Sequence, residues 1–129
     1  DTLSENERSQ LGKVRYLNQF YQNQYEEMKA HYAHYKNVVL IKGMVPDTLT
    51  QVEIDRVAYL SIDMNCVMPE IAAAEFFWDK IVPGGIILLD DYGFVSYEDQ
   101  KNAFNAFAKK KGLEILALPT GQGMMMKLS

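Results

Sequence analysis

Strand-like and helix-like segments alternate along the second half of this chain, and this alternation constrains the fold more than any other feature. Two short apolar runs rich in β-branched residues, Val57–Ile62 and Ile86–Leu89, predict buried strands. Between them, Pro69–Lys80 has apolar residues on one helical face and proline in its first turn, and Gly84-Gly85 predicts the turn into the second strand. The pattern predicts an α/β fold with a mostly parallel sheet and helices on both faces.

The last third of the chain predicts one more helix and a hairpin. A helical pattern at Tyr97–Lys111 is followed by Gly112, a residue that commonly ends helices. Leu113–Leu118 and Met124–Leu128 are short apolar runs joined by a glycine-containing loop, which predicts two antiparallel strands. The sheet is therefore expected to end in a C-terminal antiparallel hairpin.

Upstream of these elements, residues 1–36 are expected to form one long amphipathic helix that begins near Arg8. The residues of its apolar and aromatic stripe recur at spacings of three or four: Val14, Leu17, Tyr21, Tyr25, Met28, Tyr32 and Tyr35. We expect this stripe to pack against the core. Because tyrosine keeps its hydroxyl in water, the alternatives are that the stripe contacts a partner chain or covers a cleft. Val38–Ile41 then predicts another buried strand, and a short helix or turn starts at Pro46.

Length and composition exclude several classes of protein. A chain of 129 residues has the size of one domain, and its net charge of −4 argues against nucleic-acid binding. No apolar run approaches the roughly 20 residues that a membrane helix needs, so we expect no membrane partner. Cys66 is the single cysteine, and the start of the chain carries no signal pattern, which makes the cytoplasm the expected location.

Polar side chains follow two of the predicted strands at the points where those strands end. Asp63 and Asn65 follow the first, and Asp90 and Asp91 follow the second. Ligands of parallel sheets bind outside the carboxyl ends of the strands, so these oxygens would converge if the strands are neighbours. Such a cluster suits Mg²⁺, with one carboxylate left to accept a proton. The alternative is that these aspartates cap a helix or solvate a turn.

Three segments carry a resemblance to a known family. They are Lys42–Leu49, the strand ending Ser61–Asn65, and Pro83–Gly93, in which Pro-Gly-Gly precedes a strand that ends in Asp-Asp-Tyr-Gly. In this order and spacing, the chain resembles the macrocin O-methyltransferase (TylF) family of class I S-adenosylmethionine-dependent methyltransferases. The resemblance implies a partial Rossmann-like sheet, with residues 37–129 forming the C-terminal half of a methyltransferase domain.

The resemblance also implies a reaction: methyl transfer from S-adenosylmethionine to a hydroxyl of a sugar or other small molecule, assisted by Mg²⁺. By position, Asp63 would be the general base, and Asn65, Asp90 and Asp91 would be the metal ligands. The family usually has Asp-x-Asp where this chain has Asp63-Met64-Asn65. Because asparagine offers a neutral oxygen, the metal site should be weaker here.

The chain lacks the family's cofactor signature, a glycine-rich loop after the first strand and an acidic residue after the second. Alone, it should bind S-adenosylmethionine poorly or not at all. The absent strands would lie between the Val38 and Val57 strands. We therefore expect the sheet to close by direct pairing of these two, or by formation of a homodimer through the exposed edge.

Two other functions remain open from the sequence. The first is a non-catalytic interaction or dimerisation module, with the tyrosine stripe as its contact surface. The second is a metal-dependent hydrolase with Asp63 as nucleophile, which is less favoured because no second aspartate stands two residues further on.

Overall fold

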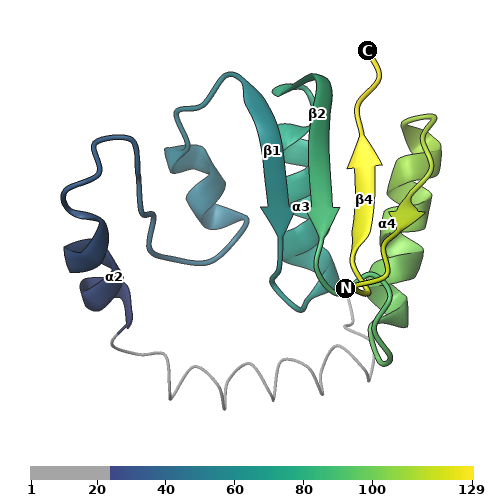
Figure 1. The fold of residues 1–129 in the computed structure, drawn as a ribbon, viewed down its shortest axis with the longest axis horizontal. Helices are drawn as coiled ribbons and strands as arrows, with labels where there is room; N and C mark the ends of the chain where they lie inside the picture. Colours follow the sequence, from purple (N-terminus) through teal and green to yellow (C-terminus); the bar gives the residue numbers. More distant parts are fainter. Residues whose placement is uncertain (1–23) are drawn as a thin grey trace.

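The computed structural model describes residues 24–129, which form a four-stranded sheet with helices packed on it (Figure 1). β1 (Val57–Ile62) pairs in parallel with β2 (Ile81–Leu89), and β2 pairs antiparallel with β4 (Gly123–Met126). β3 (Leu116–Ala117) pairs antiparallel with β4, so that the strand order is β1-β2-β4-β3. The helical elements are α2 (Gln24–Tyr32), a 3₁₀-helix (Asp47–Gln51), α3 (Val67–Trp78) and α4 (Glu98–Lys110).

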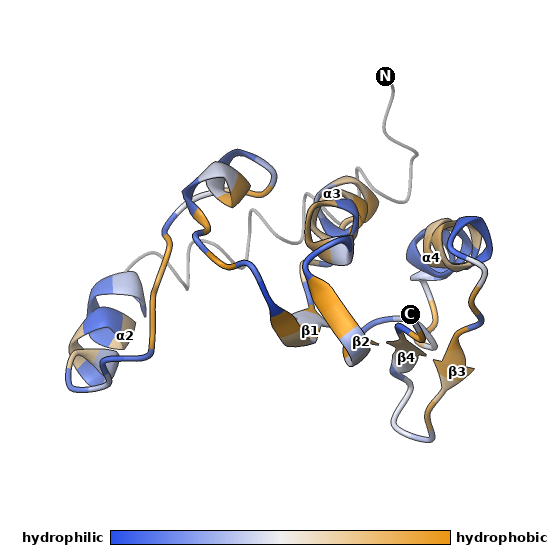
Figure 2. Ribbon diagram, turned by 90° about the horizontal axis from the view of Figure 1, so that it is seen from above, coloured by the Kyte–Doolittle hydropathy of each residue, from blue (hydrophilic) through white to orange (hydrophobic). Residues whose placement is uncertain are grey.

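The α/β class and the C-terminal hairpin are confirmed, whereas the expected layering needs correction. Only one of the three strand pairs is parallel, so the described sheet is mixed rather than mostly parallel. Both α3 and α4 lie on the same face of the sheet, and no described helix covers the other face (Figure 2). The reason is topological: β1–α3–β2 is the single parallel crossover unit, and the chain then returns through a hairpin.

The core lies between the sheet and the two helices. Ile87 of β2 and Met125 of β4 are each 1% exposed, and they face Phe104 and Phe107 of α4. Trp78 at the end of α3 meets Phe107 edge to face, with ring centroids 5.6 Å apart. Aromatic residues packed in this way bury large apolar areas, which is why α3 and α4 stay on this face.

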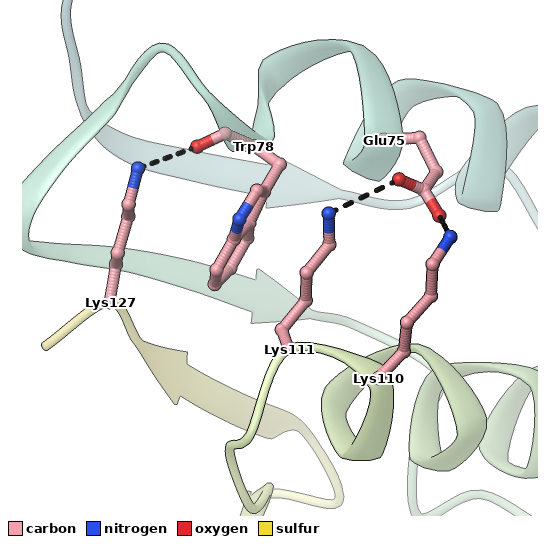
Figure 3. Close-up of polar contacts among 5 residues, drawn as sticks. All are labelled: Glu75, Trp78, Lys110, Lys111 and Lys127. Atoms are coloured by element: carbon pink, nitrogen blue, oxygen red, sulfur yellow. Dashed lines mark hydrogen bonds and ion pairs between the residues drawn. The ribbon is translucent and has the colours of Figure 1, made fainter. Parts of the chain in front are cut away.

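Polar contacts join α3, α4 and β4 at the rim of this core (Figure 3). Lys110 and Lys111 reach Glu75 with N–O distances of 3.0 and 3.4 Å. Lys127 donates to the Trp78 carbonyl oxygen at 3.0 Å. The stems of Lys111 and Lys127 also place their ammonium groups over the Trp78 ring, so these lysines cover apolar surface as well as pairing charges.

Several element boundaries differ from the sequence-based predictions. β2 begins at Ile81, before the expected turn at Gly84-Gly85, and the β1–β2 register is irregular between Val57 and Tyr59. Gly85 lies inside this strand, where only glycine fits, because a Cβ there would stand 2.6 Å from Ile81 Cγ2 and 2.8 Å from the Val82 carbonyl oxygen. α3 starts two residues before Pro69, which the first helical turn tolerates because its N–H groups lack helical acceptors. α4 and Gly112, with φ of +72°, match the prediction to within one residue.

The expected strand at Val38–Ile41 is not formed. No described strand pairs with it, and Val39 is 82% exposed. A strand needs a neighbour for its backbone hydrogen bonds, and this segment does not reach the outer edge of β1. The expected direct pairing of the two segments is therefore wrong. The predicted helix or turn at Pro46 is confirmed as the 3₁₀-helix, with Thr48 and Leu49 buried.

The predicted long amphipathic helix is described in part. α2 contains no buried residue, and within the stripe Tyr25 and Tyr32 are half-buried while Met28 and Tyr35 are exposed. Core packing of the stripe is therefore not found in this part of the helix. Val14, Leu17 and Tyr21 lie outside the described residues. Within residues 24–129, no helix combines the length and apolar character that a membrane crossing requires.

Candidate functional site

The carboxyl ends of β1 and β2 lie side by side, as the sequence predicts. Ile62 is in register with Leu89, and the Asp90 N–H donates to the Ile62 carbonyl oxygen at 3.0 Å. Asp63 and Asp90 therefore leave neighbouring strands at the same edge of the sheet. The structure brings together the four polar residues singled out in the sequence, and three further residues that were missed complete the cluster.

Asp91 is the electrostatic centre of this site. Its Oδ2 atom is buried and accepts no hydrogen bond from any residue between 24 and 129. Burial, together with the smaller effect of the negative charges on Asp63 and Asp90, raises the pKa of the Asp91 carboxyl group to about 6. A proton or a cation beside Asp91 would relieve this repulsion.

Asn65 connects the loop after β1 to the start of α4. Its backbone has a φ of 56°, in the left-handed region that asparagine tolerates better than most residues. The side-chain Nδ2 donates to Asp63 Oδ1 at 3.3 Å, and Oδ1 accepts from the Tyr97 hydroxyl at 2.5 Å. One lone pair of Oδ1 is left for another ligand.

Tyr97 and Gln122 are site residues that the sequence-based reasoning missed. Gln122, in the loop between β3 and β4, donates from Nε2 to Asp90 Oδ1 at 2.7 Å. The signal for Gln122 would have been the placement of β4 beside β2, because Gly123 is in register with Leu89. Tyr97 shows no comparable signal, since it lies 32 residues from Asn65 and precedes an ordinary helix.

Glu70 is the third residue that was missed. It lies in the first turn of α3, is 3% exposed, and accepts a hydrogen bond from the Met64 backbone N–H at 3.2 Å. Burial raises its pKa to about 7, against the opposing effect of nearby backbone N–H groups. In the sequence, a glutamate at this position is indistinguishable from the acidic residues that often begin helices.

The donor atoms suit a hard cation in chemical type, but their arrangement is not that of a dense acidic site. Among residues 24–129, no three His, Cys, Asp or Glu side chains are arranged to hold a metal ion together. The expected ligand set is instead two carboxylates, Asp90 and Asp91, with the amide oxygen of Asn65. The buried Asp91 Oδ2 without a hydrogen-bond partner among these residues fits an oxygen-seeking cation such as Mg²⁺.

Comparison with known proteins agrees with the resemblance found in the sequence. Residues 1–117 match the macrocin-O-methyltransferase (TylF) family. No curated protein matches the chain significantly. Among solved structures, the O-methyltransferase NovP is similar with a TM-score of 0.67 and 20% sequence identity, over 81% of this chain and 45% of that chain. The likeness shows the fold, and this chain spans less than half of the NovP chain. Because the family match extends over most of its residues, the chain belongs to the macrocin-O-methyltransferase family.

Proposed function

We propose that this chain carries the acceptor and metal side of an S-adenosylmethionine-dependent O-methyltransferase. The reaction would transfer a methyl group to a hydroxyl of a sugar or other small molecule. The observation that carries the proposal is the convergence of Asp63, Asp90 and Asp91 at the carboxyl ends of β1 and β2. Membership of the TylF family and the fold shared with NovP support the same reaction class.

Asp63 is proposed as the general base. Its side chain is exposed, so an acceptor hydroxyl can approach it, and Asn65 Nδ2 holds one of its oxygens. Asp63 would take the proton that the hydroxyl loses when its oxygen accepts the methyl group. A base placed in this way contributes about 10²- to 10⁴-fold to the rate.

Asn65, Asp90 and Asp91 are proposed to hold Mg²⁺, which when bound supplies positive charge that orients the acceptor oxygen. Gln122 keeps Asp90 in place through the 2.7 Å hydrogen bond. Because Asn65 contributes no charge and already accepts from Tyr97, the affinity for Mg²⁺ should be modest.

The cofactor side is proposed to lie along the outer edge of β1. Parallel crossovers are right-handed in nearly all cases, so strands added outward from β1 would place their helices on the face opposite to α3. That face is the one left without a helix in Figure 2. Leu60 and Met125 pack in the core, so alternation along the strands directs their neighbours Tyr59 and Met126, which are 57% and 43% exposed, to this open face. The reversal of winding at β1 would create a ligand crevice next to Asp63.

Isothermal titration of this chain with Mg²⁺ and with S-adenosylmethionine tests the proposal. We expect Mg²⁺ to bind at millimolar or tighter affinity, and S-adenosylmethionine to bind poorly because the cofactor residues are absent. Asp91→Asn should abolish the Mg²⁺ signal, whereas Asp79→Asn, at the far end of α3, should leave it unchanged. Absence of Mg²⁺ binding to the wild-type chain would contradict the metal-assisted reaction.

A second candidate function is the interaction or dimerisation module, which the free edge of β1 favours. This six-residue strand carries no charged residue, and its outer edge is unpaired within the described part of the chain. Such edges pair readily with other strands, so a homodimer could form there. Sedimentation should then show a dimer that Tyr59→Lys converts to a monomer, without dependence on Asp63, Asp90 or Asp91.

A further inference from the structure

Glu70 is a buried carboxyl group whose partners are backbone amides. Buried carboxylates are unfavourable unless hydrogen bonds compensate them. The Met64 N–H donates to Glu70 Oε1 at 3.2 Å, and the N–H groups of Cys66 and Asn65 also favour the charged form of this side chain. Glu70 therefore faces three consecutive amides of one loop.

That loop is the one that carries Asp63 and Asn65 out of β1. It contains the left-handed conformation of Asn65, and such conformations persist where surrounding contacts hold them. The loop ends at Cys66, the N-cap residue of α3. Glu70, one turn into α3, reaches back over the start of this helix, and its carboxyl group accepts the hydrogen bond from the Met64 N–H.

We propose that Glu70 is a positioning residue of the candidate site, which fixes the loop of residues 63–66 and so sets the directions of Asp63 and Asn65. The contacts form a continuous chain: Glu70 holds the Met64 amide, and the next residue, Asn65, binds Asp63 on one side and Tyr97 on the other. Loss of the Glu70 acceptor releases the loop, and the side chains of Asp63 and Asn65 then move together.

Only the catalytic consequence of this role rests on the proposed function. The positioning itself is a property of the folded chain and can be measured without substrate, cofactor or metal. If Glu70 merely stabilised the start of α3, its replacement would lower stability but leave the Asn65 side chain in its present environment.

The experiment compares Glu70→Gln, which keeps an acceptor oxygen, with Glu70→Ala and Glu70→Met, which remove it. Glu75→Ala is the matched control, because Glu75 lies on the same helix but pairs with Lys110 and Lys111. Two-dimensional ¹⁵N NMR follows the Met64 backbone amide and the Asn65 side-chain amide. Signals of buried residues such as Ile87 and Phe104 show whether each variant is folded.

We expect the Asn65 and Met64 signals to shift and broaden in Glu70→Ala and Glu70→Met, and to stay close to wild type in Glu70→Gln and Glu75→Ala. Glu70→Met preserves side-chain bulk and serves if Glu70→Ala does not fold. Unchanged Asn65 signals in a folded variant without the acceptor would overturn the proposal.

A Mg²⁺ titration of the same variants separates this inference from the proposed function. Residues that orient metal ligands typically change affinity by about 10- to 100-fold, so Glu70→Met should weaken Mg²⁺ binding by about that factor. If the wild-type chain does not bind Mg²⁺, the proposed metal site fails, while the NMR comparison still decides the role of Glu70.

Discussion

The Tyr97 hydroxyl donates a hydrogen bond to Asn65 Oδ1 at 2.5 Å and ties the loop after β1 to the start of α4. The two residues are 32 positions apart, so this bond fixes the relative position of two strand–helix units. It also decides which Asn65 atom faces Asp63, because Oδ1 is engaged with Tyr97 and Nδ2 is left to donate.

Tyr97→Phe should remove this bond while keeping the ring. We expect a loss of about 1 kcal/mol in the free energy of unfolding, because Asn65 Oδ1 loses a donor in a partly buried place. Urea unfolding measures this loss, and NMR should show a shift of the Asn65 side-chain amide. Tyr59→Phe, at an exposed ring on the open sheet face, should change neither quantity.

Stability should fall as pH rises, because the pKa of the Glu70 carboxyl group is higher in the folded chain than in the unfolded chain. Its pKa is raised from 4.5 to about 7 on folding, mainly by burial, so the charged form is disfavoured in the folded state. The free energy of unfolding is therefore highest below pH 4.5. It falls by up to roughly 3 kcal/mol as pH rises through about 7. Asp91, with a pKa raised to about 6, adds an effect of the same sign.

Urea unfolding at pH 5, 7 and 8.5 checks this dependence. Glu70→Gln should flatten most of the decline because it removes the titrating group. A wild-type chain that is as stable at pH 8.5 as at pH 5 would contradict the assignment of a high pKa to this buried carboxyl.

Asp91→Asn should have opposite effects on stability and on metal binding. Without Mg²⁺ at pH 8, the variant should unfold at higher urea concentration than wild type, since it relieves repulsion among Asp63, Asp90 and Asp91. Wild type should gain about 1.4 kcal/mol from Mg²⁺ at ten times its dissociation constant, and the variant should gain nothing. If Asp91→Asn lowers stability in metal-free buffer, the repulsion inferred at this site is absent.

Phe104→Ala tests the placement of the core. Phe104 is 1% exposed and packs beside Phe107, with ring centroids 6.4 Å apart. Removing a buried phenylalanine costs about 3–5 kcal/mol, which should unfold a domain of marginal stability or lower its melting temperature strongly. Phe94→Ala, at a ring that is 49% exposed, should have a much smaller effect in the same thermal scan.

The sequence predicted the elements whose evidence is local. β1 is a continuous apolar run, α3 has proline in its first turn, and Gly112 ends α4 as its position indicated. The meeting of Asp63 with Asp90 and Asp91 followed from the parallel pairing of β1 and β2, because strand ends at one edge converge.

The features that were missed or wrongly predicted depend on tertiary contacts, most of them with residues far along the chain. Val38–Ile41 has the composition of a strand, but no neighbouring strand supplies its hydrogen bonds. Gln122 and Tyr97 enter the site through contacts that span 32 residues, and Glu70 through the burial of a helix start. The catalytic and metal roles, the homodimer, the cytoplasmic location and the absence of a nucleic-acid partner stay predictions.

The most direct test of the central claim is to locate a bound divalent cation on this chain by paramagnetic NMR. Substoichiometric Mn²⁺ should selectively broaden the side-chain amide signals of Asn65 and Gln122, because both residues lie at the Asp63–Asp90–Asp91 cluster, and excess Mg²⁺ should restore them. This result would place the metal where the proposed methyl transfer needs it. Broadening confined to the backbone amide signals of surface residues such as Glu75 and Asp79, or no broadening at all, would contradict the account.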